Sequence, residues 1–475
     1  MSGIFALTID HWFAILFYIG GMKTFKNERL AALLERERAT YVETHPQSRA
    51  LYESADHLFG RVPMTWMNKW SGGFPMSYDT AHGAIITDVD GHTYIDFALG
   101  DTGAMAGHSP EPLVRAMQQR LGVDGGVTTM LPTEDGEWVA AELSRRFGLP
   151  SWSFSLSATD ANRWLLRLVR LATSRPKILV FSYSYHGSVD ETFVVVGPDG
   201  APALRPGGVA PSFDPTTTTR VVEFNDIEAL QRELGYGDVA AVLMEPAMTN
   251  IGIVLPQPGF LDAVRSACDA TGTLLIFDET HTFSAGPGGA TRFYNVSPDA
   301  ITIGKSLGGG VPCGAYGLSA DLAQRVLNAV SEGADIVDVG GVGGTLAGNA
   351  MSLAAMRAVL GEVLTDDVFG PMTELATAFA ASLQATFDRH ELAWSVSQLG
   401  ARCEYRFAAP APINGGASSA HANADLEEYL HLYGINRGVL ITPFHSMALM
   451  CPATTMEMVT AHQVMFDAAV DELMA

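Results

Sequence analysis

Short apolar runs alternate with stretches of helical periodicity between residues 150 and 320. The runs cover 177–181, 239–244, 273–277 and 300–303, and the helical patterns cover 159–173, 226–234 and 258–271. Near-continuous apolar strands between helices are typical of a parallel sheet whose two faces are both covered. In such sheets ligands bind at the carboxyl ends of the strands. We therefore expect an α/β fold with its functional site along that edge.

The segments on either side of this region predict further elements. A charged helix is expected over 23–50, an irregular stretch over 51–80, a hairpin over 83–97, and helices over 111–121 and 134–147. After about residue 345 the pattern is mostly helical, with strands near 402–407 and 438–442 and a surface loop over 411–423. Because 475 residues exceed what one hydrophobic core usually supports, we expect at least two folding units.

Charge and cysteine content exclude several classes of function. The chain has 29 Lys plus Arg and 52 Asp plus Glu, and its net charge of −23 argues against nucleic acid or an anionic membrane as partner. The apolar run 12–19 is too short to span a bilayer, and no Lys or Arg precedes it. The four cysteines show no metal-binding spacing, so we expect no metal and a cytoplasmic protein. Residues 1–21 are interpreted as an upstream extension.

Two strand ends carry side chains that could perform chemistry. Asp278 and Glu279 follow the run 273–277, and Lys305 follows the run 300–303, so a carboxylate and an amine are expected at one edge of the sheet. A structural ion pair is the alternative interpretation. A phosphate-binding P-loop ending at Gly304-Lys305-Ser306 is excluded, because that motif needs a glycine at position 299, where this chain has Asp.

Three weaker signals accompany this pair. Small and hydroxylic residues at 155–159 open an amphipathic helix, whose free N–H groups favour a bound anion, although Ser157 or Thr159 could simply cap the helix. Tyr185 follows the run 177–181 and could lie over a flat ligand, or it could be a packed loop residue. The glycines of 340–348 could approach a ligand or form a simple loop. An anion site, an aromatic ring, a carboxylate and a lysine are together what pyridoxal phosphate requires.

The order of these motifs resembles class III (ω-type) aminotransferases of the fold-type-I pyridoxal-phosphate superfamily. The branch that it resembles most contains glutamate-1-semialdehyde aminomutase and β-amino-acid transaminases. The similar segments are Asp-Val-Asp-Gly at 88–91, Tyr-Ile-Asp-Phe at 94–97, Gly-His-Ser-Pro at 107–110, Glu-Pro-Ala-Met-Thr-Asn-Ile-Gly at 245–252, Asp278-Glu279, Pro298-Asp299, Gly304-Lys305 and Gly344-Thr345 with Gly348-Asn349.

The resemblance implies a fold and a set of roles. The fold would be a large domain with a mainly parallel seven-stranded sheet and a smaller α+β domain. Its parts would be an apolar extension (1–22), an N-terminal segment of the small domain with the substrate entry (23–85), the large cofactor-binding domain (86–344) and the C-terminal small domain (345–475). Lys305 would form the internal aldimine and Asp278 would pair with the pyridine nitrogen. The other cofactor contacts would be Ser157, Ala158, Thr159, Tyr185, His186, Glu245 and Thr345.

The resemblance also implies a homodimer with shared active sites, since Thr345 would reach the phosphate bound by the neighbouring subunit. Two features depart from the family. Ala158 stands where relatives usually carry Gly, and neither 280–285 nor 438–452 contains the arginine that many relatives use for a substrate carboxylate. Arg61, Lys69 and Arg292 remain as candidates. Trp66 and Trp70 lie in the segment that matches the substrate entry, and they suggest a bulky or aromatic substrate, with ordinary interface packing as the alternative interpretation.

These features predict an aminotransferase that moves an amino group from an amine or β-amino acid to a keto acid. One alternative is an intramolecular aminomutase, or a racemase, using the same cofactor. Another is a protein that binds the cofactor without catalysis, which would account for Ala158 and the absent arginine but not for the retained Lys305.

Overall fold

A seven-stranded sheet forms the larger part of the molecule. The computed structural model describes residues 25–209, 211, 213–330 and 340–475, and the predicted extension at 1–21 lies outside these residues. The strand order is β4 (Ser151–Ser155), β12 (Gly314–Leu318), β11 (Ala300–Ile303), β10 (Leu274–Asp278), β9 (Val239–Met244), β5 (Lys177–Phe181) and β8 (Thr219–Val222). β8, β5, β9, β10 and β11 pair in parallel, whereas β12 is antiparallel to β11 and β4. The expected mainly parallel α/β fold is confirmed.

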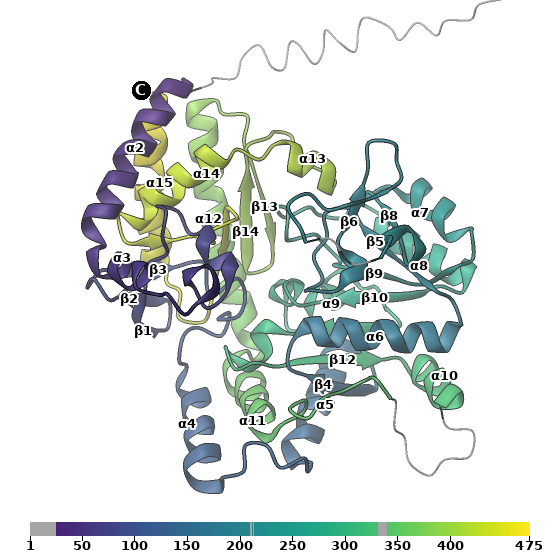
Figure 1. The fold of residues 1–475 in the computed structure, drawn as a ribbon. Coiled ribbons are helices and arrows are strands. Elements are labelled where there is room, and N and C mark those ends of the chain that lie inside the picture. Colours follow the sequence, from purple (N-terminus) through teal and green to yellow (C-terminus); the bar gives the residue numbers. More distant parts are fainter. Residues whose placement is uncertain (1–24, 210, 212, 331–339) are drawn as a thin grey trace, which may run out of the picture.

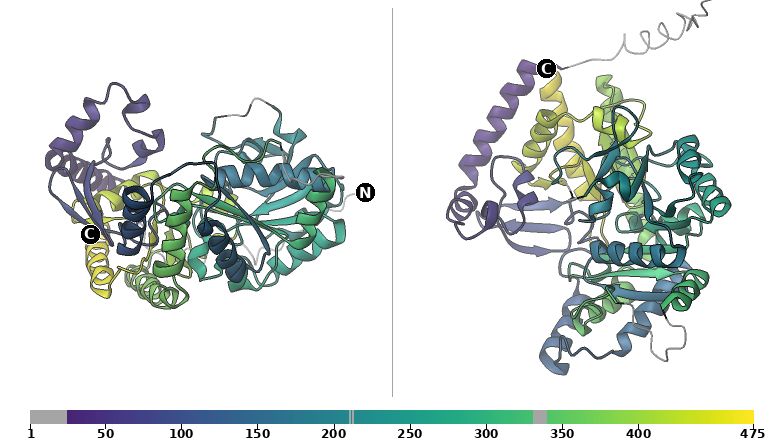
Figure 2. Two further views of the ribbon diagram at one scale, coloured as in Figure 1. Left: turned by 90° about the horizontal axis from the view of Figure 1, so that it is seen from below. Right: turned by 45° about the vertical axis from the view of Figure 1, so that its right-hand side comes forward.

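Helices cover both faces of this sheet (Figures 1 and 2). α6 (Ala158–Thr173) and α10 (Ala320–Val330) pack on the face that carries Ile178, Val180 and Leu243. α5 (Glu134–Phe147), α7 (Ile227–Leu234) and α8 (Phe260–Thr271) belong to the cluster of the other face, with Leu179, Phe181 and Phe277. Every side chain of β9 is buried, which explains its unbroken apolar run.

The expected elements match these bounds closely, and the misses have physical reasons. β4, β8 and β12 have no long apolar run, because they are short and contain Ser, Thr or Gly. The prediction of a surface loop over 411–423 was wrong in part. Residues Gly415–Ala420 form the helix α13, in which Ser418 is fully buried and bonds to the Ile251 carbonyl. Asn414 caps this helix by accepting a hydrogen bond from the Ala417 N–H.

The smaller part of the molecule combines both ends of the chain. One sheet joins β1 (Tyr78–His82), β2 (Ile85–Asp88), β3 (Thr93–Asp96) and β15 (Val439–Leu440), and β15 pairs in parallel with β3. Another joins β13 (Ser395–Leu399), β14 (Arg402–Arg406) and β16 (Met447–Leu449). The predicted domain boundary at residue 86 therefore falls inside a sheet, because a strand from the C-terminal segment completes the hairpin.

Helices surround these two small sheets and link them to the larger part. They are α2 (Asn27–Thr44), α3 (Pro46–Glu53), α12 (Phe369–His390), α14 (Ala424–Ile435) and α15 (Met456–Met474), while α4 (Glu111–Gln119), α9 (Gly289–Tyr294) and α11 (Ala350–Ala358) lie with the larger part. β6 (Val194–Val196) and β7 (Pro202–Leu204) form a separate hairpin. No helix among the residues that the structure describes is long and apolar enough to cross a membrane.

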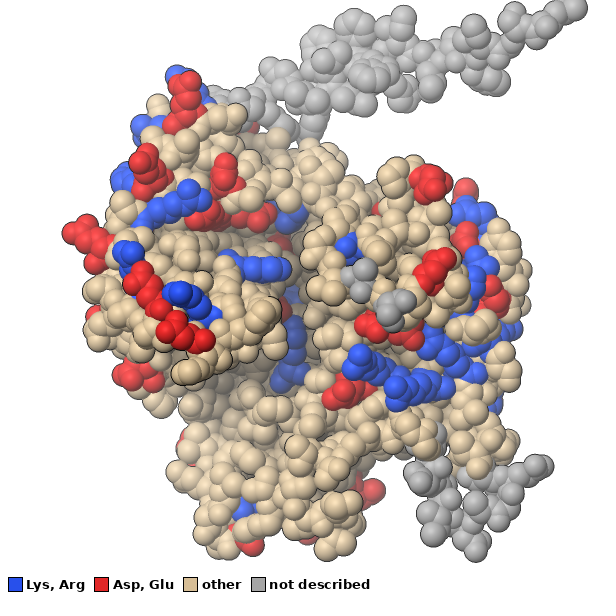
Figure 3. Space-filling model, in the orientation of Figure 1, with Lys and Arg blue, Asp and Glu red and all other residues tan. Residues whose placement is uncertain are grey.

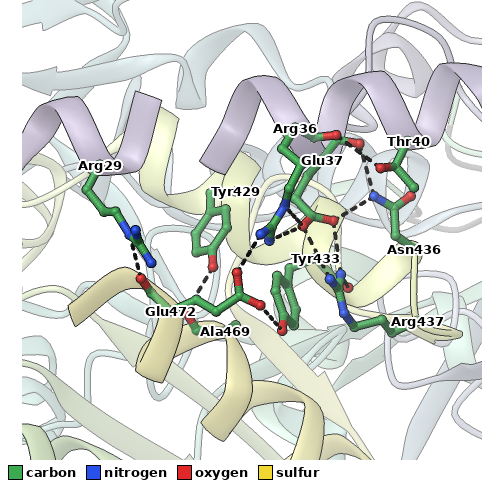
Figure 4. Close-up of polar contacts among 10 residues, drawn as sticks. All are labelled: Arg29, Arg36, Glu37, Thr40, Tyr429, Tyr433, Asn436, Arg437, Ala469 and Glu472. Atoms are coloured by element: carbon green, nitrogen blue, oxygen red, sulfur yellow. Dashed lines mark hydrogen bonds and ion pairs between the residues drawn. The ribbon is translucent and has the colours of Figure 1, made fainter. Parts of the chain in front are cut away.

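Polar contacts hold α2 against the C-terminal helices (Figure 4). The buried carboxylate of Glu37 accepts hydrogen bonds from Arg437 at 2.9 Å and Asn436 at 2.8 Å. Arg36 contacts Glu472 of α15 at 2.6 Å. Burial would raise the pKa of Glu37, but the hydrogen bonds from Arg437, Asn436 and Arg36 outweigh it and lower that pKa. Ionised Glu37 thus ties the N-terminal segment, which carries the predicted substrate entry, to the C-terminal end.

Candidate active site

Lys305 lies at the carboxyl edge of the large sheet, two residues after the end of β11. Its Nζ atom is 2.8 Å from Asp101 Oδ2 and 2.8 Å from His281 Nε2. Lys305, Asp101 and Thr102 all have positive φ angles, of 48°, 49° and 83°. Such conformations are costly for residues other than glycine and gather at functional sites. The backbone is therefore shaped to bring the amine and these partners together.

Asp278, the last residue of β10, is buried at the same edge. Its carboxylate accepts hydrogen bonds from Asn162 at 2.9 Å, from His186 Nδ1 at 3.0 Å and from the Thr280 N–H at 3.1 Å. Burial would raise the pKa of Asp278, but the hydrogen bonds from His186, Thr280 and Asn162 outweigh it and lower that pKa to about 2. Asp278 is thus a buried anion at neutral pH. Its neighbour Glu279 instead turns toward the start of α9 and accepts from the Thr291 N–H at 2.6 Å.

The start of α6 offers an anion site beside them. Ser157 is the N-cap and accepts a hydrogen bond from the Asp160 N–H at 3.2 Å, so capping is one of its roles. The N–H groups of Ala158 and Thr159 begin the 16-residue helix, where no helical carbonyl can accept from them. Two glycines pack against this turn. A Cβ at Gly187 would overlap Thr159, and a Cβ at Gly304 would lie 2.9 Å from the Ala158 nitrogen.

A cavity of about 320 Å³ joins these groups. Ser157, Ala158, Thr159, Tyr185, Asp278, Thr280, His281 and Lys305 all line it. The Tyr185 side chain remains 38% exposed, so one part of its ring is open to a ligand. Thr280 Oγ1 is buried and has no hydrogen-bond partner among the described residues. The sequence prediction that a strand-end lysine, a carboxylate, an aromatic ring and an anion site lie together agrees with this arrangement.

Two other predicted contacts lie outside the cavity lining. His186 is fully buried behind Asp278, and its Nε2 atom has no hydrogen-bond partner in the described part of the chain. Glu245 is buried after β9 and bonds to Thr249. Burial raises the pKa of Glu245, which favours its neutral form. His186 contacts Asp278 and does not line the cavity, and the roles predicted for His186 and Glu245 stay predictions.

A larger, mostly apolar cavity of about 590 Å³ adjoins the first. Arg61, Trp66 and Trp70 line it, as does Asp101, which contacts Lys305. Trp66 meets Phe444 edge-on, with ring centroids 6.0 Å apart. The segment 51–78 and the C-terminal residues 440–444 thus line one pocket, and Asp101 in its wall contacts Lys305. Figure 3 shows a groove between the two halves of the visible face, with Lys and Arg side chains along it.

The three candidate partners for a substrate carboxylate, two arginines and a lysine, take different positions. Arg61 is exposed, lines the apolar cavity and donates to the Glu53 carbonyl at 2.9 Å. Lys69 lies over the Phe444 ring, 5.2 Å from its centroid. Arg292 is exposed and bonds to the Arg145 carbonyl at 3.3 Å, so it takes no part in either cavity lining.

Sequence reasoning missed three residues around Lys305. Asp101 and His281 contact its amine directly, and Arg402 of β14 contacts Thr102 and His281. The only available signals were weak. His281 stands in the segment that departs from the family, and Arg402 is a charged residue in a strand whose five residues are all buried. Buried charges are rare without a partner, and this rule could have drawn attention to Arg402.

Comparisons with known proteins identify the family of this chain. The family model for class-III aminotransferases matches residues 66–470. Glutamate-1-semialdehyde 2,1-aminomutase of Chloroflexus aggregans is 34% identical over 78% of this chain and 85% of its own length. This chain belongs to the class III aminotransferase family. Its fold-type-I architecture and its cofactor, pyridoxal phosphate, follow from this membership.

Solved structures give the same result. A glutamate-1-semialdehyde aminomutase from Pseudomonas aeruginosa, solved in complex with PMP, is 44% identical, with a TM-score of 0.92 over 94% of this chain and 99% of that chain. A β-phenylalanine aminotransferase from Variovorax paradoxus is 25% identical, with a TM-score of 0.82 over 93% of this chain and 97% of that chain.

The residues of the smaller cavity fit pyridoxal phosphate. The N–H groups at the start of α6 suit its phosphate, and the buried anion of Asp278 suits a protonated ring nitrogen. Lys305 supplies the amine, and the open side of Tyr185 suits the flat ring. Ala158, which stands where relatives usually carry Gly, is the first residue of α6, and its methyl group leaves the helical turn intact.

Thr345 does not line this cavity. It is exposed and lines a separate pocket of about 390 Å³ with residues 128–132. It also shares a further pocket with Leu156, which does line the cofactor cavity. Its predicted contact with the phosphate of a neighbouring subunit stays a prediction, as does the dimer itself.

Replacement of Gly187 by Ala is expected to weaken cofactor binding. The new Cβ would overlap Thr159 in the anion site, and the φ of 78° adds a backbone cost of about 1 kcal/mol. Gly148→Ala is the matched control, because its φ is 77° but no atom of the described residues lies within 4 Å of its Cβ position. Titration with pyridoxal phosphate should give at least a tenfold higher Kd for Gly187→Ala than for Gly148→Ala. Equal affinities would contradict the assigned anion site.

Proposed function

We propose that this chain moves an amino group by means of pyridoxal phosphate on a substrate that carries a bulky apolar group. The observation that supports the substrate class is the larger cavity, which Trp66, Trp70 and Phe444 line and which reaches Lys305 through Asp101. Burial of an aromatic group there would stabilise the complex by about 25 cal/mol for each Å² of apolar surface removed from water. Arg61, which lines the same cavity, is the proposed partner for a substrate carboxylate.

The cofactor, when bound, withdraws electrons from the carbon that carries the substrate amino group. This chain's residues then have separate tasks. Asp278, held ionised by its hydrogen bonds, keeps the ring nitrogen protonated. The start of α6 holds the phosphate, and Tyr185 restrains the ring. Lys305 Nζ holds the cofactor before the substrate arrives and afterwards takes and returns the substrate proton. Asp101 and His281 orient this amine.

The relatives favour an aminomutase outcome over the aminotransferase that the motifs led us to expect. The similar proteins at 34% and 44% identity are both glutamate-1-semialdehyde aminomutases. We therefore propose that nitrogen moves within one substrate molecule. The apolar cavity supports a larger substrate than a small acid with polar groups at both ends.

Transamination between two molecules is the second candidate. It is favoured by the same apolar cavity together with the similarity to a β-phenylalanine aminotransferase at 25% identity. A class III enzyme of this kind would take a β-amino acid or an aryl amine as donor and a keto acid as acceptor.

Product analysis separates these outcomes. The protein, loaded with pyridoxal phosphate, is incubated with ¹⁵N-labelled glutamate-1-semialdehyde and with ¹⁵N-labelled aryl β-amino acids, each with and without a keto acid. An aminomutase yields the shifted isomer without an acceptor, whereas a transaminase transfers label only when the acceptor is present. Chiral analysis detects a racemase. Binding of the cofactor without any turnover across the panel would instead favour the non-catalytic alternative.

Removal of the tryptophans is expected to raise the KM for aryl substrates. Trp66→Ala and Trp70→Ala each take an aromatic wall from the cavity, and a loss of about 1–3 kcal/mol corresponds to a 5- to 150-fold increase. Phe59→Ala is the control, since Phe59 is 89% exposed and does not line the cavity. Steady-state kinetics with an aryl and a small aliphatic substrate provide the measurement. If both substrates respond equally, the cavity is not the apolar subsite.

A further inference from the structure

His281 occupies an unusual position for a histidine. It is buried, and its two ring nitrogens contact different groups. Nε2 lies 2.8 Å from Lys305 Nζ, and Nδ1 lies 2.8 Å from Thr102 Oγ1, 3.4 Å from Arg402 Nη2 and 3.9 Å from Asp101 Oδ1. Burial lowers the pKa of His281 well below its ordinary value, and the positive charge of Arg402 acts in the same direction. The ring is therefore neutral at neutral pH and carries one proton, on one of the two nitrogens.

Arg402 favours one of the two neutral forms of the ring. A guanidinium group only donates hydrogen bonds, and the Nη2 atom directs its hydrogens toward Thr102 Oγ1 at 2.7 Å and toward His281 Nδ1. Acceptance of this contact by Nδ1 would place the ring proton on Nε2. Arg402 cannot move away from this contact without repacking, because only 1% of it is exposed.

An Nε2–H group directed at Lys305 needs an acceptor. An ammonium has three donors and no lone pair, whereas a neutral amine has one lone pair. The geometry points to His281 as a further catalytic residue, which donates its Nε2 proton to the lone pair of the free Lys305 amine and so favours the neutral amine. This inference rests on the proposed use of Lys305 as the reacting amine.

Asp101 acts in the opposite direction. Its Oδ2 atom accepts from Nζ at 2.8 Å in either protonation state, but it attracts the ammonium more strongly. Burial alone would raise the pKa of Asp101, but a positive charge on Lys305 outweighs it and lowers that pKa. Lys305 thus lies between a carboxylate that favours the charged form and a histidine that favours the neutral form. Lys305, Asp101, Arg402 and Asp278 are the charged groups that face the His281 ring.

The balance matters whenever the lysine is not bonded to the cofactor. At that stage Nζ must accept the substrate proton, which only a neutral amine can do. Without the His281 donor, pairing with Asp101 would leave more of the amine already protonated at neutral pH. We therefore expect the fraction of neutral Lys305 to fall when His281 is replaced.

The low lysine content makes a direct measurement practical. The chain has five lysines, at positions 23, 26, 69, 177 and 305. The enzyme is loaded with pyridoxamine phosphate, the aminated cofactor, so that Lys305 is a free amine. Trace acetylation at different pH values, followed by unfolding, digestion and mass spectrometry, gives the midpoint for each lysine, because only neutral amines react.

Replacement of the two partners of Lys305 should shift the acetylation midpoint of Lys305 in opposite directions. His281→Phe should move its midpoint up by about one pH unit, a tenfold loss of neutral amine at pH 7, and Asp101→Asn should move it down. His281→Gln should retain part of the effect, because its amide can both accept from Arg402 and donate to Lys305. His421→Gln, at an exposed histidine outside the cavity lining, should leave the midpoint unchanged.

An unchanged or lowered midpoint in His281→Phe would overturn the proposal. If that variant does not fold, ¹⁵N spectra of the histidines in the unaltered enzyme test it independently, with His281 assigned by its loss in His281→Gln. A proton on Nδ1 of His281 would equally overturn it. Neither measurement needs turnover. Failure of the proposed function would be seen as no product from any substrate, and it is therefore distinguishable from failure of this inference.

Discussion

Lys305→Ala is expected to remove all measurable turnover and the visible absorbance of lysine-bound cofactor. The variant keeps the start of α6, Asp278 and Tyr185, so cofactor should still bind, but no amine remains to hold it covalently or to move the substrate proton. Loss of a group that serves as both nucleophile and base costs more than about a thousandfold in rate. Absorbance spectra, borohydride trapping and product assays provide the three measurements.

Lys177→Ala is the matched control for this experiment. Lys177 is the first residue of β5 and pairs with Asp238 at 3.5 Å, at the amino end of the sheet and away from the cavity. It should retain the spectrum and the activity of the unaltered protein. Turnover by Lys305→Ala at more than a few per cent of the control would show that Lys305 is not the reacting amine.

Asp278→Asn is expected to reduce turnover by a factor of about 10²–10⁴, the size of effect that follows loss of a positioned charged group. Asn162 and the Thr280 N–H can still donate to the amide oxygen, so the shape of the site should persist. The negative charge that keeps the cofactor ring protonated is lost, and cofactor affinity should also fall. Asp238→Asn is the control, because Asp238 pairs with Arg220 at the opposite edge of the sheet.

The pH dependence follows from the same carboxylate. Because the pKa of Asp278 is lowered to about 2 from an ordinary 3.8, its contribution to stability is present above about pH 4 and is lost as the pH falls toward 2. Between pH 5 and 9 the group stays ionised. Asp278 should therefore contribute no step to the pH–activity profile in this range. Any step that the unaltered enzyme shows between pH 5 and 9 should also be present in Asp278→Asn.

The sequence alone determined the architecture and part of the chemistry. Apolar runs at 177–181, 239–244 and 300–303 match β5, β9 and β11 at both ends, because these strands are buried at every residue except Lys177 and are therefore mostly apolar. Lys305 and Asp278 were found because strand ends of a parallel sheet meet at one edge. The start of α6 was found because small and hydroxylic residues open an amphipathic helix.

Only the tertiary structure decided what surrounds Lys305. Asp101, His281 and Arg402 come from a loop after β3, the segment after β10 and strand β14, and no local pattern links positions so far apart. The apolar pocket likewise needs residues 51–78 and 440–444 together, because β15 completes the sheet that begins near the N-terminus. Periodicity reports which side of an element is buried, but not which element buries it. The surroundings of the Lys305 amine therefore depend on contacts that folding alone creates.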